Sequence, residues 1–235
     1  MGHAGIAEVL CQNGFDWLTI DLEHSMIDFN QARELISTID NLGVSPLVRL
    51  TSIDTNQIKR VMDHGAHGII APMVKSESDI DYLVDSIYYP PKGKRGVGLA
   101  RAQSYGPGFA SYRDSLSEEG AILVAQIEHI DAVKNLKNII GHEEVDAFIV
   151  GPYDLSASMG LAGQFDHQDV LDALAEINSV SRDLNICSGT HVVEPDLKEL
   201  GKAIEAGNKF IAYSVDFRML DVMASGAKDL MSRKK

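Results

Sequence analysis

The feature that most constrains the fold of this chain is a regular alternation of two kinds of segment. Short apolar runs rich in β-branched residues recur along the 235 residues, and segments with helical periodicity lie between them. This alternation builds parallel sheets whose strands are joined by helices. Seven runs are predicted as strands: Trp17 to Leu22, Pro46 to Leu50, Gly68 to Val74, Ile122 to Ile127, Ala147 to Gly151, Ile186 to Thr190 and Phe210 to Val215. The predicted helices include Phe29 to Leu42, Asn56 to His64, Glu77 to Ile87, Asp131 to Ile140 and Gln168 to Leu184.

These elements predict a single α/β domain over residues 1–235, of the (β/α)8 TIM barrel type. The commonest closed form of such a sheet is an eightfold barrel of roughly 250 residues, which suits this length. One strand is missing from the count. Before Trp17 lies only a short helical pattern, Ile6 to Asn13, and the five residues ahead of it are too few and too glycine-rich for a strand. We therefore expect either a barrel that is open there or a first element outside this chain.

Composition excludes several classes of partner. Thirty-four acidic residues against 21 basic ones give a net charge of −13, and Lys and Arg form no cluster, so nucleic acid is not expected as a partner. Apolar stretches such as Ala121 to Ala125 are far shorter than the roughly 18 residues of a membrane helix, and no signal segment follows Met1. We expect a cytoplasmic protein without a membrane partner. Cys11 and Cys187 have neither zinc nor disulfide spacing and are expected to be buried apolar residues.

Charged residues end several of the predicted strands, which is where parallel barrels carry their reactive groups. The strand period of two places Asp21 and Glu23 on one face, with His24 just beyond. The alternative is a solvated strand end beside a helix N-cap. Arg49 ends the second run and could hold a carboxylate through two hydrogen bonds, or it could be a structural ion-pair partner.

Two further carboxylates follow the fourth and fifth strands. The period of two places Val124, Gln126 and Glu128 on one face, and the turn at Gly151-Pro152 presents Asp154 at the same end. Paired buried carboxylates repel unless a cation lies between them, and oxygen ligands suit Mg²⁺, Mn²⁺ or a similar divalent ion. A metal site is therefore predicted. The alternative is that both residues cap the helices that follow.

Other polar residues give weaker signals. Lys75 follows a strand, where its amine could form a Schiff base, but the acidic run Ser76 to Asp79 favours a charged, solvated side chain. The long irregular stretch Tyr88 to Leu116 is expected to be functional, and its part Gly93 to Gly106 is expected to form a flexible wall or lid. Six histidines show no metal-binding spacing and are expected at the surface or behind the site, namely His64, His67, His129, His142, His167 and His191.

Several of these segments, in this order, resemble the HpcH/HpaI aldolase family, the metal-dependent pyruvate aldolases, over most of the chain. The matching segments are Gly14 to Trp17, Ile20 to His24, Pro46 to Arg49, Gln57 to Ala66, Ala71 to Val74, Tyr89 to Pro91 with Arg95 to Gly98, Gln126 to Glu128 and Gly151 to Ser156.

The resemblance implies a barrel of the phosphoenolpyruvate/pyruvate-binding type, with a divalent metal (Mg²⁺, Mn²⁺ or Co²⁺) on Glu128 and Asp154 and water-mediated support from Asp21 and Glu23. Arg49 would face the keto oxygen and the developing enolate. His24 would be the general acid/base, with Asp63 polarising its imidazole, within the chain or across a subunit interface. A homo-oligomer, trimer or hexamer, is implied. Bound pyruvate would be oriented by Gln126, by the backbone N–H of Tyr153 and by Asp154, and the aldehyde would contact the Tyr88 to Leu116 loop and Ser214.

The resulting hypothesis is an aldolase that reversibly cleaves 4-hydroxy-2-oxo acids to pyruvate and an aldehyde. The chemistry agrees, because a divalent cation and a guanidinium at the keto oxygen stabilise the enolate that bond cleavage leaves. Two alternatives stay open. One is a lyase like the citrate lyase β-subunit or malyl-CoA lyase, against which the acidic net charge argues mildly. The other is an inactive barrel that binds a metal and a 2-oxo acid.

Overall fold

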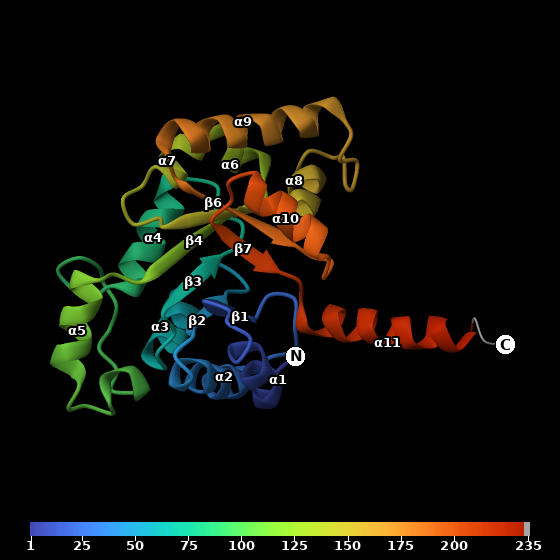
Figure 1. Ribbon diagram of the computed structural model, residues 1–235. Helices are drawn as coiled ribbons and strands as arrows, with labels where there is room; N and C mark the ends of the chain where they lie inside the picture. The colour runs from blue at the N-terminus through green and yellow to red at the C-terminus, as the bar shows by residue number, and fades with distance from the viewer. Residues whose placement is uncertain (233–235) are drawn as a thin grey trace.

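Seven strands form one parallel sheet in the computed structural model, which describes residues 1–232, with side chains except at 227–230 and 232. The strands follow one another in chain order from β1 to β7 (Figure 1). They are β1 (Trp17–Asp21), β2 (Ser45–Arg49), β3 (Gly68–Ala71), β4 (Ile122–Ile127), β5 (Ala147–Val150), β6 (Cys187–Val192) and β7 (Phe210–Tyr213). All seven predicted strands are confirmed, with ends shifted by a few residues.

Helices connect the strands and cover the outer side of the curled sheet (Figure 1). They are α1 (Ala4–Cys11), α2 (Phe29–Asn41), α3 (Thr55–Asp63), α4 (Glu77–Ile87), the 3₁₀ turn η1 (Arg101–Gln103), α5 (Phe109–Glu118), α6 (Ile130–Lys134), α7 (Leu136–Ile140), α8 (Pro152–Ser158), α9 (Gln168–Leu184), α10 (Leu197–Glu205) and α11 (Asp216–Ser232). Polar caps start several of them, as where Asp28 accepts from the amides of Asn30 and Gln31. The predicted helix Asp131 to Ile140 is divided in two at Asn135.

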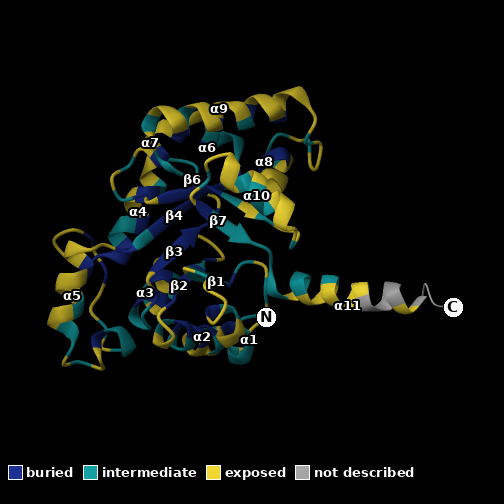
Figure 2. Ribbon diagram, viewed as in Figure 1, coloured by how far each residue is buried: buried dark blue, intermediate teal, exposed yellow. Residues whose placement is uncertain are grey.

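The two faces of the sheet bury different residues. Leu123, Ala125 and Ile127 of β4 belong to the large core between sheet and helices. Val124 belongs to a smaller core on the concave side, with Leu47, Ile70, Ile149 and Phe210. Figure 2 shows β3 and β4 buried, β7 intermediate, and much of the outward helix surface exposed. The predicted alternation along β4 is therefore confirmed, and it directs Gln126 to the concave side.

The sheet is curled but does not close into an eightfold barrel. Within residues 1–232 the edge strands β1 and β7 pair only with β2 and β6. Trp17 and Phe210 stack across this opening, with ring centroids 4.3 Å apart and planes 2° from parallel. The sheet of the described chain is therefore open between β1 and β7, which agrees with both expectations for the missing strand.

The segment from Tyr88 to Leu116 is more ordered than the predicted lid. It contains η1 and most of α5, and the buried Arg95 anchors it. The guanidinium of Arg95 donates to Asp63 Oδ1 at 2.5 Å and to the Tyr112 hydroxyl at 3.1 Å. Asp63 ends α3, and this end of the helix precedes β3, so the anchor lies toward the N-terminal ends of the strands. This anchor restrains part of the predicted wall or lid, and the flexibility of the Gly93 to Gly106 stretch stays a prediction.

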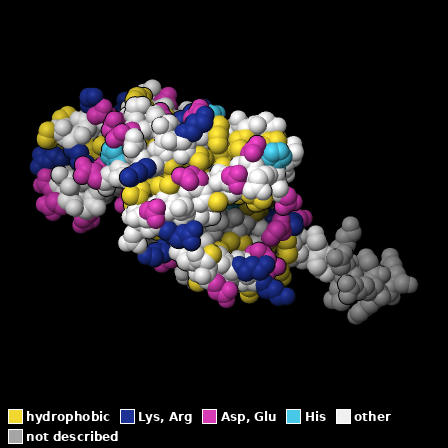
Figure 3. Space-filling view, turned by 90° about the horizontal axis from the view of Figure 1, so that it is seen from above, with side chains coloured by type: hydrophobic (Ala, Val, Ile, Leu, Met, Phe, Trp, Pro, Cys, Tyr) yellow, Lys and Arg dark blue, Asp and Glu magenta, His cyan; other side chains and the backbone are white. Residues whose placement is uncertain are grey.

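Surface charge is mixed. On the face shown in Figure 3, Lys and Arg side chains are scattered among Asp and Glu side chains. None of the described helices combines the length and the apolar character that a membrane crossing requires. Helix α11 extends away from the body of the molecule (Figure 1).

Candidate active site

The C-terminal ends of β1 and β2 bring Asp21 and Arg49 together. The two residues are register partners at the ends of neighbouring parallel strands, so their side chains leave the sheet side by side. Arg49 Nε donates to Asp21 Oδ1 at 2.9 Å and Arg49 Nη2 donates to Oδ2 at 2.7 Å. This paired geometry orients the guanidinium. Burial alone would raise the pKa of Asp21, but the hydrogen bonds and charge of Arg49 outweigh it and hold the pKa below its ordinary value.

Glu23 and His24 follow β1 directly. Arg49 Nη1 lies 3.3 Å from Glu23 Oε2, and His24 Nε2 lies 3.6 Å from the same oxygen. Glu23 Oε2 is buried and has no hydrogen-bond partner among the described residues. Burial raises the pKa of Glu23, and the negative charge of Glu128 adds to this rise. The His24 side chain is exposed, at 64 %, so it is accessible to a substrate.

Glu128 is the most deeply buried carboxylate of the group, at 2 % exposure. Gln126 donates a side-chain hydrogen bond to Glu128 Oε2, and the backbone N–H of Met73 donates to Oε1 at 2.6 Å. Met73 has a φ of +54°, an unusual value for a residue with a side chain, at the end of β3. Burial raises the pKa of Glu128, and the nearby negative charge of Asp154 raises it further. Sequence reasoning missed Met73, because a backbone donor leaves no side-chain signal.

Asp154 and Tyr153 lie in the first turn of α8, immediately after the turn at Gly151 that follows β5. Asp154 is exposed, and its charge acts on Glu128. The Tyr153 ring is also exposed and packs edge-on against Phe165, with centroids 4.8 Å apart. The amides of a first helical turn lack intrahelical acceptors. The expectation that the backbone of Tyr153 matters more than its ring remains a prediction.

The donor set suits a divalent metal ion. Glu23, Glu128 and Asp154 contribute three carboxylates to one region, and Arg49 already pairs with Asp21. Glu23 Oε2 lies 3.3 Å from Arg49 but receives no hydrogen bond from a described residue. Glu128 is buried beside the negative charge of Asp154, and a bound cation would compensate the two charges. Among the described residues, no three His, Cys, Asp or Glu side chains are arranged around one point that could hold a metal. A site with two carboxylate ligands, whose other positions water and substrate would fill, fits both the gathered carboxylates and the absence of a three-residue group.

Asp63 does not meet His24 within the chain. It ends α3, and its carboxylate accepts from the fully buried guanidinium of Arg95 at 2.5 Å and from Gln103 at 3.4 Å. A Cβ at Gly98 would lie 2.7 Å from Asp63 Oδ2, so the Tyr88 to Leu116 segment packs tightly on this carboxylate. The within-chain form of the prediction for Asp63 is therefore corrected, and only contact across a subunit interface would bring it to His24.

Ser214 and Lys75 lie at the ends of β7 and β3. Ser214 has a φ of +60°, its hydroxyl donates to the carbonyl of Val193 at 3.0 Å, and its own carbonyl lies 3.2 Å from His191 Nε2. The backbone N–H of Lys75 donates to Asp79 at 2.9 Å. The pKa of Asp131 on α6 is held low mainly by Lys134, and the Lys75 charge contributes to this. Lys75 thus interacts with the charged outer surface.

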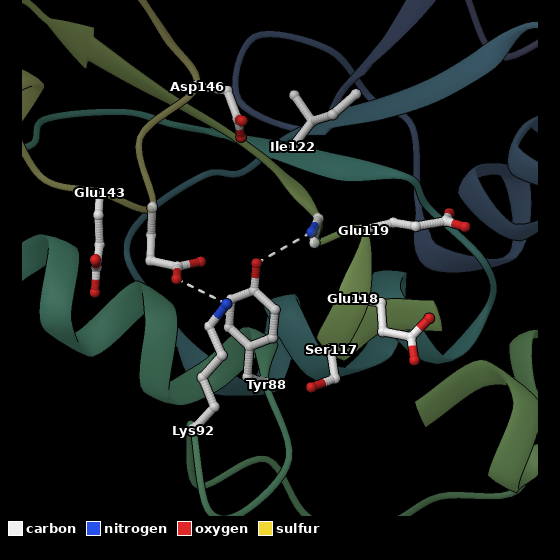
Figure 4. Close-up of a pocket in the computed structure, with 11 residues that line it drawn as sticks. Tyr88, Lys92, Ser117, Glu118, Glu119, Ile122, Glu143 and Asp146 are labelled. Carbon is white, nitrogen blue, oxygen red and sulfur yellow. Dashed lines mark hydrogen bonds and ion pairs between the residues drawn. The ribbon is translucent and has the colours of Figure 1, made fainter. Parts of the chain in front are cut away.

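A hollow of about 230 Å³ lies at the opposite end of the strands (Figure 4). It is lined by residues that precede β4 and β5, among them Glu119, Asp146 and Tyr88, whose hydroxyl accepts from the Ala121 amide at 3.1 Å. Lys92 pairs with Glu144 at 2.7 Å beside it. None of the predicted site residues lines this hollow, so it is separate from the candidate active site.

Comparison with known proteins identifies the family of the chain. The model of the HpcH/HpaI aldolase/citrate lyase family matches residues 2–221. The chain belongs to this family. It is 32% identical over 214 residues to a hydroxypyruvate/pyruvate aldolase of Roseobacter denitrificans, covering 91% of this chain and 83% of that protein. It is 34% identical over 229 residues to a 4-hydroxy-2-oxo-heptane-1,7-dioate aldolase of Shigella sonnei, covering 97% of this chain and 85% of that protein.

A solved HpcH/HpaI aldolase from Desulfitobacterium hafniense superimposes with a TM-score of 0.85 at 29% identity, covering 98% of this chain and 89% of that one. The family and its named aldolases confirm the predicted enzyme class. The HpcH/HpaI chain described here is an aldolase, a carbon–carbon lyase.

Proposed function

We propose that the chain is a divalent-metal-dependent aldolase that reversibly cleaves 4-hydroxy-2-oxo acids to pyruvate and an aldehyde. The observation that carries this proposal is the excess of carboxylates around one oriented guanidinium, beside an exposed imidazole. Glu128 is buried, Glu23 is half-buried, Arg49 is held by Asp21, and His24 reaches solvent. The names of the relatives, which refer to pyruvate, hydroxypyruvate and a 4-hydroxy-2-oxo acid, support this substrate class.

Glu128 and Asp154 are the residues proposed to hold the metal, with Asp21 and Glu23 acting through water. Mg²⁺, Mn²⁺ and Co²⁺ are the candidates, since the donors are all oxygen. When bound, the ion would act as a Lewis acid at the keto oxygen of the substrate. Gln126 and the Met73 amide hold Glu128 in place through two donated hydrogen bonds, one to each carboxylate oxygen.

Arg49 would stabilise the negative charge that develops on the keto oxygen. Cleavage breaks the C3–C4 bond, its electron pair stays on the three-carbon fragment as an enolate, and C3 of this enolate then takes up a proton to give pyruvate. A guanidinium already fixed by Asp21 does not have to reorganise as this charge develops. Asp21 is in this sense a positioning residue for Arg49.

His24 would accept the proton of the 4-hydroxyl in cleavage and return it in condensation. Its exposure leaves room for a water between imidazole and substrate. The His24 amide donates to Asp21 Oδ1 at 3.3 Å, so the same carboxylate that orients Arg49 also fixes the backbone of the acid/base residue. Tyr153 through its backbone, Gln126 and Ser214 remain proposed substrate-binding residues.

The test is a pyruvate-release assay across a panel of 4-hydroxy-2-oxo acids with Mg²⁺, Mn²⁺, Co²⁺ or a chelator. We expect pyruvate release with metal, its loss with chelator and its recovery when metal is restored. Borohydride added with pyruvate should leave activity intact and add no mass to Lys75. A pyruvyl adduct trapped at Lys75, with activity surviving chelation, would instead show a Schiff-base aldolase.

A further inference from the structure

His191 is the last residue of β6 on the face that points to the concave side of the sheet, and it lies near the C-terminal end of the strand. On β6 the concave core takes Cys187, and the period of two then directs Gly189 and His191 to the same side. The strand register shows how far along the sheet His191 lies. Gln126 pairs with Ile149, and Ile149 pairs with Gly189, so Gln126 and Gly189 are at the same level. Glu128 and His191 each follow two residues later. His191 therefore lies on the same side and at the same level of the sheet as Glu128.

The surroundings of His191 are those of a residue facing a concave site. Its side chain is exposed to solvent. Partial desolvation by the protein around the imidazole lowers the pKa of His191, and the positive charge of Arg49 lowers it further, while the hydrogen bond to Ser214 and the charge of Asp21 oppose this. The charged groups that act on His191 are thus Arg49 and Asp21, from the far side of the curled sheet.

The hydrogen bond to Ser214 selects one tautomer of the imidazole. His191 Nε2 lies 3.2 Å from the Ser214 carbonyl oxygen. A carbonyl oxygen only accepts, so Nε2 carries the proton and donates. Ser214 is itself fixed, because its N–H donates to Val192 at 2.7 Å and its hydroxyl donates to Val193 at 3.0 Å. In the neutral imidazole Nδ1 is then a bare acceptor, and no described residue donates to it.

We propose that His191 is a specificity-determining residue whose Nδ1 accepts a hydrogen bond from a substrate hydroxyl next to the bond that is made or broken. This rests on the proposed function and adds a preference for hydroxylated substrates. The hydroxyl can come from the 2-oxo acid, as in hydroxypyruvate, or from the aldehyde, as in lactaldehyde. Either would meet a neutral acceptor at Nδ1. Arg49 can only donate, Asp21 is already paired with it, and Glu128 and Asp154 are proposed for the metal.

The test measures condensation with four substrate pairs. Pyruvate and hydroxypyruvate differ by one hydroxyl, as do propionaldehyde and lactaldehyde, so the four combinations separate the two sources. His191→Phe keeps a ring but has no acceptor. His191→Gln keeps an amide that can donate to Ser214 while its oxygen accepts. His167→Phe, which introduces the same ring at an exposed residue before α9, is the matched control.

His191→Phe should lower kcat/KM by about fivefold to tenfold for pairs that carry the relevant hydroxyl, the range expected for one neutral hydrogen bond. Pyruvate with propionaldehyde should be unchanged, and His191→Gln should recover part of the loss. If only the pairs with hydroxypyruvate lose rate, the hydroxyl that His191 accepts from belongs to the 2-oxo acid. If only the pairs with lactaldehyde lose rate, it belongs to the aldehyde. An equal loss of kcat/KM for all four pairs, or no loss for any pair, overturns the proposal. His191 would then serve only to hold Ser214 through its hydrogen bond.

A second measurement is independent of turnover. In the Mg²⁺-loaded protein, the ¹⁵N resonances of His191, assigned by their absence in His191→Gln, should show the Nε2–H tautomer. The Nδ1 resonance should move with hydroxypyruvate or lactaldehyde and stay in place with pyruvate or propionaldehyde. If the wild-type protein condenses no pair, the proposed function fails, and this titration alone decides the role of His191. An Nδ1–H tautomer, or equal shifts with all four ligands, would overturn it.

Discussion

Glu128 and Asp154 carry the metal prediction at the scale of single residues. Glu128→Gln and Asp154→Asn each remove one of two proposed carboxylate ligands while keeping the side-chain shape. We expect each to weaken metal binding by at least about tenfold and to abolish turnover at low metal. Isothermal titration with Mn²⁺ measures the affinity. Glu118→Gln, in the hollow at the opposite end of the strands, is the control and should bind metal like the wild type. Full activity in either ligand variant would disprove the site.

His24 is predicted to move a proton without holding the metal. His24→Ala should lower kcat by about 100-fold, the lower range for general acid/base catalysis, and leave the metal dissociation constant within about twofold. The exposed imidazole, 3.6 Å from a carboxylate oxygen, is replaceable without leaving a buried cavity. Steady-state kinetics and metal titration on the same preparation separate the two effects. Loss of metal binding would make His24 a ligand.

Asp21 links the site to stability in acid. Burial raises the pKa of its carboxyl, but Arg49 outweighs this and holds the folded-state pKa below the ordinary value of 3.8. A depressed carboxyl pKa stabilises the fold above that ordinary value, and this stability is lost as the pH falls through the folded-state pKa. In metal-free protein, urea unfolding from pH 6 down to pH 3 should therefore show a decline that is shallower in Asp21→Asn. Parallel curves for the two proteins would contradict the assignment.

At the scale of elements, the turn between β5 and α8 places a glycine against the buried carboxylate. A Cβ at Gly151 would lie 2.8 Å from Glu128 Oε2 and 2.9 Å from Glu128 Cβ. Gly151→Ala should displace Glu128, weaken metal binding and cost about 1–3 kcal/mol of unfolding free energy through overpacking. Gly201→Ala on α10 meets open space and should be neutral or stabilising by up to about 1 kcal/mol. Metal titration and urea unfolding of both variants test this, and equal behaviour would disprove the close contact.

At the scale of the whole molecule, α11 is the element that bears on subunit assembly. It extends from the body (Figure 1), and Phe217, Leu220 and Met223 recur every three residues along it with more than half of each side chain exposed. Helical side chains at this spacing share one side, and an apolar side left in water favours association. This supports the expected homo-oligomer, whose number of subunits stays a prediction.

Leu220→Glu tests that expectation. Light scattering after size exclusion should show an oligomer for the wild type and a smaller species for Leu220→Glu, because a charge in an apolar contact is poorly compensated. Leu197→Glu, on the exposed surface of α10, is the control and should keep the wild-type mass. A monomeric wild type, or no change in Leu220→Glu, would remove α11 from the interface.

Much of this protein follows from sequence alone. The strands are short runs with a period of two, and parallel strands must place their C-terminal ends at one edge, so Asp21, Arg49, Glu128 and Asp154 are predicted neighbours without coordinates. Local sequence also fixes the helix starts, through caps such as Asp28. These features depend on residues close together in the sequence, and the regular geometry of strands and helices then sets the direction of their side chains.

Tertiary structure alone decided the remainder, because it depends on contacts between residues distant in sequence. Asp63 is engaged by Arg95, 32 residues away, and the Met73 amide reaches a carboxylate 55 residues away. His191 follows the predicted run Ile186 to Thr190 by one residue, and only the register across β4, β5 and β6 places it level with Glu128. The sheet is open between β1 and β7 because these two strands do not pair with each other. Strand pairing joins segments distant in sequence, so no single segment predicts it.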